Sequence, residues 1–363
     1  MRKQLLTTLM SAILCVIASA QVIDAGKFFA GGANDAEELF KGYFSPYFNA
    51  FGTSLTGGWY NTAKPHHLGG FDITVTFNTA IVPTSDRTFD IAELTLESLE
   101  LATGTDNITP TIAGENNTGS QLAYNYPTGS TDEIDAFEMP KGTGFPYIPS
   151  PMLQLGVGLI KDTEIMGRYM PTYSTGETKM GMWGIGFKHG LKQWIPFIKK
   201  VPVLHLSVQY GYTKMNAEIG LNVKPSDINA IDQTTSANWD NQKMGFVTHS
   251  HTGNILISAD LPIVCFYGGI GFANTKNNLK LVGDFPSIDF NESLSFGGPV
   301  VTDDINSALN NPIDVDVQNS DGSKTKPRYN VGMRFKFSVV TIHGDYTYAD
   351  YSLVSFGLGI NFR

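Results

Sequence analysis

Residues 329–339 read YNVGMRFKFSV, in which every odd-numbered position is apolar and every even-numbered position is polar or glycine. Successive side chains of a β-strand point to opposite faces, so this period of two predicts a strand with one apolar and one polar face. The same alternation recurs in residues 354–362, which read VSFGLGINF, and in residues 204–212 and 71–78. The chain is therefore expected to be rich in two-faced strands.

The length of these segments favours strands that cross a membrane. They run for about ten residues or more, which is the length that a tilted strand needs to span a hydrocarbon core. Strands of soluble proteins are commonly about five or six residues long. Aromatic residues near the ends of the apolar faces, such as Tyr329 and Phe337, are typical of the girdles at membrane interfaces. The pattern favours an outer-membrane β-barrel over the alternative, a secreted sandwich or adhesin.

The composition agrees with an all-β protein. The 363 residues include 38 Gly, 12% aromatic residues and only 16% charged residues. This argues against a disordered chain or a coiled coil, because both need many charges and few aromatic residues. The net charge of −9 is the opposite of the basic surface that binds phosphates, so no nucleic-acid partner is expected.

The N-terminus predicts export. An Arg-Lys pair precedes an apolar run over residues 5–17, and the motif ASA ends at Ala20. This combination is typical of a secretory signal peptide over residues 1–20, and the apolar run is too short for a membrane anchor. Cleavage leaves Cys265 as the only cysteine, so the exported chain forms no internal disulfide. The expected location is the cell outer membrane, with outer-membrane lipid as a partner.

The predicted fold class is all-β, a transmembrane antiparallel β-barrel of about 10–14 strands with a short N-terminal helix or plug segment. Ten strands are predicted from the alternation, at residues 69–83, 151–160, 163–173, 178–189, 203–222, 242–259, 263–281, 328–339, 341–349 and 352–363. Tight turns at one rim and long outer loops at about 84–150, 223–241 and 282–327 are typical of bacterial barrels. Residues 93–101 alternate weakly and could add a hairpin, so the range extends to fourteen.

Residues 21–68 precede the first strand and are predicted to form a periplasmic or plug segment. Asn34 and Glu37 have the spacing of a capping box, which predicts a short helix. The helix is expected to end at about Phe40, ahead of Gly42 and a following proline. Residues 190–202, on the short-turn rim, mix Trp, Ile and Phe with Lys, which is compatible with an interfacial stretch or with an ordinary rim turn.

Several motifs carry a family resemblance. Residues 57–66 (GGWYNTAKPH) with 70–75 (GFDITV), and residues 183–189 (WGIGFKH) with 193–196 (QWIP), resemble an uncharacterised outer-membrane β-barrel family common in Bacteroidota. More remotely, the Gly-rich segment with its Asn-x-Ala is similar to the long-chain fatty-acid transporter (FadL-like) barrels. That resemblance implies a plug in the lumen and transport of hydrophobic molecules. Thr62 stands where those barrels have proline, and no ligand-contacting residue follows from the resemblance.

The sequence predicts no enzyme, no catalytic residue and no cofactor. Histidines at 205, 249, 251 and 343 could act as bases, but no nucleophile motif accompanies them. His249 and His251 share a strand face, and His66 adjoins His67, but two ligands without a third are weak evidence for a metal site. No metal site is therefore predicted.

The polar faces supply the candidates that line the lumen: Glu164, Arg168, Arg334, Lys336, His343 and Asp345. A turn at Val339-Val340 would place Arg334 opposite Asp345 and Lys336 opposite His343, as directly interacting cross-strand pairs. Such pairs could be a structural network that fills a narrow barrel or a constriction that selects solutes.

Two functions remain open. The first is a channel or transporter for hydrophobic or small solutes, gated by residues 21–68 and binding a hydrophobic small-molecule ligand. The second is a non-transporting barrel that presents its long loops as a binder or adhesin, or that serves an envelope or secretion machine. The plug-like segment at residues 21–68 favours the first function, and the sequence does not identify protein partners.

Overall fold

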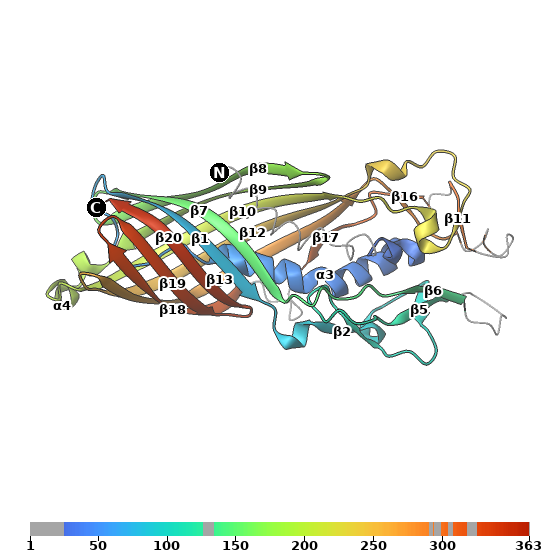
Figure 1. The fold of residues 1–363 in the computed structure, drawn as a ribbon, viewed down its shortest axis with the longest axis horizontal. Coiled ribbons are helices and arrows are strands. Elements are labelled where there is room, and N and C mark those ends of the chain that lie inside the picture. The colour runs from blue at the N-terminus through green and yellow to red at the C-terminus, as the bar shows by residue number, and fades with distance from the viewer. Residues whose placement is uncertain are drawn as a thin grey trace.

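A computed structural model describes residues 25–125, 134–289, 293, 299–303, 308–317 and 325–362. The predicted signal peptide, residues 1–20, lies outside the described residues. Ten long strands form one closed antiparallel barrel (Figure 1). They are β1 (Phe71–Ile81), β7 (Tyr147–Leu159), β8 (Thr163–Thr175), β9 (Thr178–Gly190), β10 (Leu204–Gly220), β12 (Lys243–Asp260), β13 (Val264–Val282), β18 (Thr325–Phe337), β19 (Val340–Tyr348) and β20 (Ser352–Phe362).

Wall strands that follow one another along the chain pair with each other, and the pairing of the first strand, β1, with the last, β20, closes the cylinder. Strand β1 pairs with β20, so that Phe71 lies opposite Phe362, and β12 pairs with β13 over their whole length. All ten predicted strands are present, and the fold class is confirmed at the lower limit of the predicted strand number. Large apolar side chains on the outward faces, among them Ile73, Ile185 and Phe356, are exposed, as a lipid-facing surface requires.

The turn between β18 and β19 corrects one prediction. It consists of Ser338 and Val339, with φ of 57° at Ser338, and not of Val339-Val340. A β-branched residue disfavours positive φ more strongly than serine does. The register therefore shifts by two residues, and Arg334 lies opposite His343.

The shift in register also changes the residues that lie opposite Lys336 and Asp345. Lys336 lies opposite Thr341, and Asp345 lies opposite Gly332. The predicted pairs Arg334–Asp345 and Lys336–His343 are therefore wrong.

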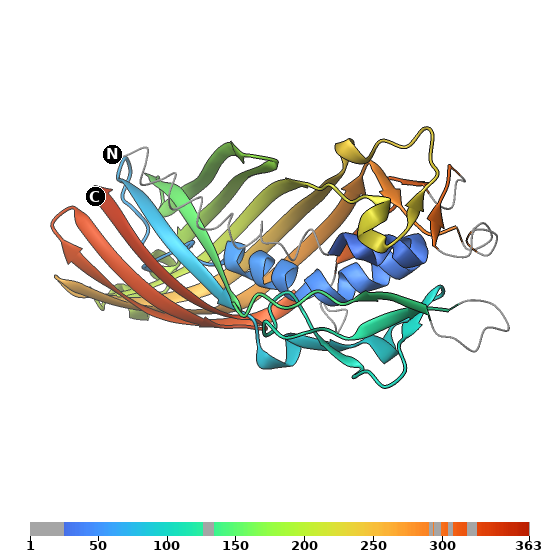
Figure 2. The same cartoon turned by 45° about the vertical axis from the view of Figure 1, so that its right-hand side comes forward.

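The N-terminal helix is much longer than predicted. Helix α3 (Gly32–Thr56) runs straight through Gly42 and Pro46, where the sequence predicts its end. The helix lies inside one end of the barrel and among the long connections, as Figure 2 shows. Its burial there on nearly every side outweighs the unfavourable propensity of Gly and Pro. None of the helices in the described part of the chain is both long and apolar enough to cross a membrane.

The predicted capping box is also wrong, because the helix starts before it and its N-cap residue is Gly31. The Asn34 side chain donates instead to the Glu97 carboxylate. Asp35, in the first turn, accepts hydrogen bonds from the main-chain N–H groups of residues 97–99. Asp35 thus ties the start of α3 to the first long connection. Burial raises the pKa of the Asp35 carboxyl, although the three N–H donors oppose this shift.

The long connections fold into small sheets at one end of the barrel (Figure 1). Their strands are β2 (Thr88–Asp90), β3 (Leu99–Leu101), β4 (Ile108–Pro110), β5 (Gln121–Tyr124), β6 (Ile134–Glu138), β11 (Ile231–Asp232), β14 (Asp284–Pro286), β15 (Val300–Val301) and β16 (Ala308–Asn310). Strand β17 (Asp314–Val317) also lies in a long connection but pairs with the wall strand β13, beyond the stretch of β13 that pairs with β18. The weak alternation at residues 93–101 corresponds to β3, which pairs with β5 outside the barrel wall.

Short helical turns complete the described chain. They are η1 (Ala25–Gly31), η2 (Thr84–Asp86), η3 (Ile91–Glu93), η4 (Lys192–Trp194), α4 (Pro196–Lys199), η5 (Pro225–Ile228) and η6 (Trp239–Asn241). Elements η4 and α4 occupy the predicted interfacial stretch at the short-turn rim. Trp194 is 65% exposed and Phe197 is 86% exposed there, as an interfacial segment requires.

Candidate functional site

The side chains that line the barrel interior change from polar to apolar along the strands. In β10 the inward residues Ser207, Gln209 and Thr213 are followed by Met215 and Ile219. The same change from polar to apolar occurs along β9 and β12, towards the end that carries the long connections. The interior therefore has a polar half near the short-turn rim and an apolar half near the long connections.

Helix α3 fills the apolar half. Its aromatic side chains pack against the wall, and the Phe48 ring stacks on Phe246 of β12 with centroids 4.2 Å apart. Tyr47 is buried on another face of the helix, where its hydroxyl donates to the carbonyl oxygen of Phe145 at 2.8 Å. The helix is thus held on one side by barrel strands and on another by the first long connection.

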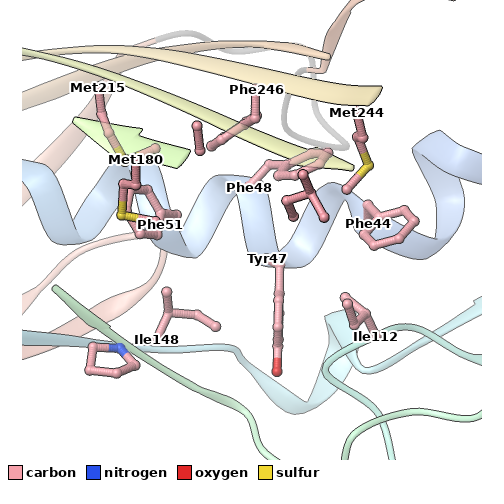
Figure 3. Close-up of a pocket in the computed structure, with 13 residues that line it drawn as sticks. Phe44, Tyr47, Phe48, Phe51, Ile112, Ile148, Met180, Met215, Met244 and Phe246 are labelled. Carbon is pink, nitrogen blue, oxygen red and sulfur yellow. The ribbon is translucent and has the colours of Figure 1, made fainter. Parts of the chain in front are cut away.

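An apolar cavity of about 50 Å³ remains between the helix and the wall (Figure 3). The helix contributes aromatic rings, the strands contribute methionines, aliphatic side chains and Phe246, and the first long connection contributes Ile112. The lining residues are Phe44, Tyr47, Phe48, Phe51, Ile112, Ile148, Pro149, Met180, Met215, Ala217, Ile219, Met244 and Phe246. Because the Tyr47 hydroxyl is bonded to the connection, the cavity offers a guest an apolar surface.

Residues 57–68, here named the strap, follow α3 through the polar half of the lumen. Trp59 and Ala63 of the strap are buried and pack with Met166 and Leu256 of the wall. The Ala63 N–H donates to the Ser258 hydroxyl at 3.1 Å. In the described structure, helix and strap together occupy both halves of the lumen.

Two wall arginines hold the junction between helix and strap. Arg168 of β8 donates to the carbonyl oxygens of Leu55 and Gly57, at 3.0 and 2.6 Å. Arg328 of β18 donates to the carbonyl oxygen of Thr56 at 2.7 Å. These carbonyls lack partners within the helix, and the negative end of the helix dipole favours cations there. The guanidinium groups therefore bind the helix C-terminus to the wall.

A second ionic group lies nearer the short-turn rim. Arg334 donates to Asn61 of the strap at 2.8 Å and to the Asp260 carboxylate at 3.2 Å. Lys336 approaches the same carboxylate oxygen at 3.5 Å. His343 is buried opposite Arg334.

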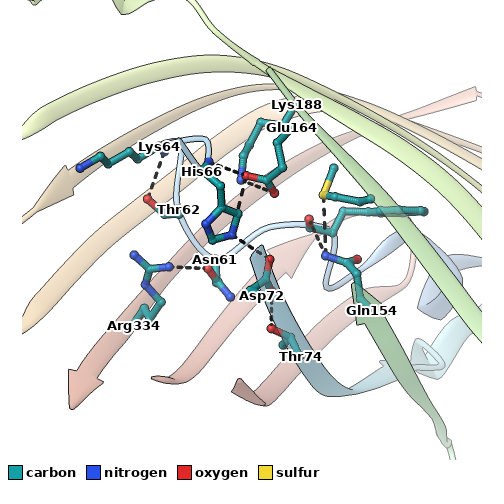
Figure 4. Close-up of polar contacts among 12 residues, drawn as sticks. Asn61, Thr62, Lys64, His66, Asp72, Thr74, Gln154, Glu164, Lys188 and Arg334 are labelled. Atoms are coloured by element: carbon teal, nitrogen blue, oxygen red, sulfur yellow. Dashed lines mark hydrogen bonds and ion pairs between the residues drawn. The ribbon is translucent and has the colours of Figure 1, made fainter. Parts of the chain in front are cut away.

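A third group joins the strap to strands β1 and β8 (Figure 4). The His66 imidazole contacts the Asp72 carboxylate at 2.8 Å, and the His66 main-chain N–H donates to Glu164 at 3.0 Å. The Lys188 ammonium forms an ion pair with Glu164 at 3.1 Å. All four side chains are buried.

The six predicted lumen residues thus fall into separate groups. Arg168 binds the helix end, Glu164 belongs to the His66 group, and Arg334, Lys336 and His343 lie together at the rim. Asp345 accepts hydrogen bonds from Tyr267 and Asn330 instead of pairing with Arg334.

Sequence reasoning missed Arg328 and the apolar half of the lumen. Arg328, like Arg334, occupies an even-numbered position on the polar face of the strand, so the alternation could have identified it. The apolar half also leaves a signal in the sequence. The apolar residues of β10 occupy even-numbered positions up to Tyr212 and odd-numbered positions from Met215 onward. No comparable signal marks His66, which precedes the first strand.

No curated protein matches this chain. A similar solved structure is the translocator domain of the autotransporter NalP from Neisseria meningitidis, with 10% identity and a TM-score of 0.28, covering 87% of this chain and 94% of that chain. The outer membrane protease OmpT from Escherichia coli has 7% identity and a TM-score of 0.30, with 81% and 96% covered. The toluene transporter TbuX from Ralstonia pickettii has 6% identity and a TM-score of 0.24, with 81% and 90% covered.

At identities of 10% or less and TM-scores of 0.30 or less, these likenesses carry no conclusion about activity. A family model matches residues 1–362 and is described as a family of unknown function, DUF6588. Because this match spans nearly the whole chain, the protein belongs to that family.

Proposed function

We propose that this protein is an outer-membrane barrel that binds a small apolar molecule between α3 and the wall and passes it inwards. The observation that carries the proposal is the apolar cavity within a barrel whose other half is polar. Ligand sites are typically apolar concavities with few polar groups. The exposed apolar side chains of the outward faces and the predicted signal peptide support the location.

The lining suits a guest of variable shape. Met180, Met215 and Met244 come from three adjacent strands, and methionine side chains repack around irregular guests at low cost. The present cavity of about 50 Å³ is small, so a guest larger than a few carbon atoms would displace these side chains. The remote resemblance of the Gly-rich segment and its Asn-x-Ala, ahead of the first strand, to the fatty-acid transporter barrels points to the same class of cargo.

Passage requires the strap to move, because the strap occupies the polar half of the lumen. Its polar contacts with the wall are hydrogen bonds that involve Arg168, Arg334 and Glu164, and Trp59 and Ala63 add apolar packing. The hydrogen bonds can exchange with water one at a time, and the strap takes part in a small apolar cluster, whereas α3 belongs to the large apolar core. We therefore assign gating to the strap and binding to the helix.

The test is a titration of the detergent-purified chain with the apolar fluorescent dye N-phenyl-1-naphthylamine, combined with mass spectrometry of co-purified small molecules. Ala217→Leu fills the cavity and is expected to weaken dye binding at least tenfold. Met215→Ala enlarges the cavity and is expected to strengthen it. Met166→Ala makes the same change beside the strap and is expected to leave binding unaltered. Equal binding by all four proteins would refute the cavity as the site.

One observation favours a second function, a barrel that anchors its long connections for binding. Helix and strap fill the described lumen, and the connections form ordered sheets around the start of α3. This alternative predicts only bulk phospholipid in the mass spectra and no uptake of the dye into vesicles. Enrichment of one amphiphile over bulk lipid would favour transport.

A further inference from the structure

The His66 group has the geometry of a metal site. The imidazole Nε2 of His66 lies 2.8 Å from Asp72 Oδ1 and 3.9 Å from Glu164 Oε2. These three atoms lie within 4.8 Å of one another, and all three residues are buried. Atoms at such separations can bind one ion at the usual distances of about 2.0–2.2 Å after small side-chain rotations.

The remaining carboxylate oxygens are held by other groups. The Thr74 hydroxyl donates to Asp72 Oδ2 at 2.7 Å. The Lys188 ammonium lies 3.1 Å from Glu164 Oε1. Each carboxylate is therefore oriented by its outer oxygen, and its inner oxygen faces the imidazole. Partners that orient ligands in this way are general features of metal sites.

The charge of the group also favours a cation. Asp72 and Glu164 contribute two negative charges, and Lys188 contributes one positive charge. With a neutral imidazole, one negative charge remains uncompensated in a buried site, which is unfavourable. A divalent ion would change the net charge of the group from −1 to +1. It would bind the lone pair of His66 Nε2, the atom that contacts Asp72 in this structure.

We propose that His66, Asp72 and Glu164 bind a divalent transition-metal ion, with Zn²⁺ as its representative. One imidazole and two carboxylates are the donor set of zinc and related ions, whereas Mg²⁺ and Ca²⁺ prefer oxygen ligands alone. His66 belongs to the strap, Asp72 to β1 and Glu164 to β8. The ion would therefore fasten the strap to two strands of the wall. The binding itself does not depend on the transport that we propose.

The experiment uses the untagged full chain in detergent, stripped of metal and titrated with Zn²⁺ against a chromophoric chelator, in excess Mg²⁺. The expected result is one Zn²⁺ per folded chain. X-ray absorption of the loaded protein is expected to show one imidazole and two carboxylate ligands. Folding is verified by the heat-dependent gel mobility of intact barrels. A folded wild-type protein that binds no Zn²⁺ at this stoichiometry overturns the proposal without reference to any variant.

Variants identify the ligands. His66→Gln and Asp72→Asn are expected to weaken Zn²⁺ binding at least tenfold. His67→Ala alters the adjacent exposed histidine and is expected to retain wild-type affinity. If folded His66→Gln and His67→Ala bind Zn²⁺ equally, the assigned site is wrong.

Discussion

The guanidinium of Arg168 lies over the indole ring of Trp59, with its central carbon 3.7 Å from the ring centroid. Arg168 belongs to the wall and Trp59 to the strap. The same guanidinium donates to the carbonyls of Leu55 and Gly57, on either side of the helix end. One side chain thus fixes the end of α3, the start of the strap and the ring that fills the lumen beside it.

Arg168→Met is expected to lower the free energy of unfolding by about 3 kcal/mol, because it leaves buried carbonyl groups without a donor. It is also expected to increase permeability to antibiotics that the intact outer membrane excludes. Stability is measured by urea titration of the heat-dependent gel mobility, and permeability by growth inhibition. Lys179→Met replaces an outward, exposed cation at the long-connection rim and is the matched control. A stability loss without leakage would mean that the strap is structural and does not gate.

Glycine at position 211 is required by the strap. A Cβ on Gly211 would overlap the indole ring of Trp59, whereas a Cβ on Gly167 would meet nothing within 4 Å. Gly211→Ala is expected to destabilise the barrel by about 1–3 kcal/mol through overpacking. Gly167→Ala is expected to change stability by no more than about 0.5 kcal/mol. The same urea titration checks both, and equal effects would show that Trp59 does not pack as described.

The wall was predictable because its signal is local. A period of two in residues 329–339 needs no knowledge of the partner strand. The register between β18 and β19 was harder to predict, because it depends on whether the turn begins at Ser338 or one residue later. That choice displaces Arg334 from Asp345 to His343.

Helix α3 could not be predicted to its full length because its stability is not local. Gly42 and Pro46 end a helix by propensity, and only burial among strands and connections overrides them. The His66 group was beyond reach for a related reason. His66 and Glu164 are 98 residues apart in the chain, and the pairing of β1 with β7 and of β7 with β8, together with the path of the strap, brings the group together.

Arg334 and Asp260 form a buried ion pair whose strength a double-mutant cycle can measure. Arg334→Met leaves the Asp260 carboxylate with weaker compensation and is expected to cost about 3 kcal/mol. Because the two residues interact directly, the double variant with Asp260→Asn is expected to cost about 2 kcal/mol less than the sum of the single effects. Urea titrations of the four proteins give the coupling, and additive effects would show that the pair contributes nothing.

The same Arg334 variant separates packing from conduction. Arg334 is buried beneath Asn61 of the strap, so ions do not reach it while the strap is in place. Single-channel conductance in planar bilayers is therefore expected to be unchanged in Arg334→Met. A changed conductance would mean that the lumen conducts past the strap and that Arg334 lines the path.

Asp303, in the last long connection, is hydrogen-bonded to the preceding long connection. Its carboxylate accepts hydrogen bonds from the hydroxyls and main-chain N–H groups of Thr235 and Ser236. These bonds, led by the Thr235 hydroxyl, lower the pKa of Asp303 from 3.8 to about 2. Because the folded value is the lower one, the ionised carboxylate favours the folded connection above about pH 4, and this contribution is lost as the pH falls towards 2.

Thr235→Val removes the strongest of these donors and is expected to raise the Asp303 pKa towards 3.8. Thr234→Val removes a hydroxyl that bonds Asp232 instead, so it is the matched control and is expected to leave Asp303 unchanged. The measurement is a pH titration of the side-chain carboxyl ¹³C resonance of Asp303 in detergent micelles. A wild-type midpoint near 3.8 would show that Asp303 does not join the two connections in solution, because an unbonded carboxylate titrates at its ordinary pH.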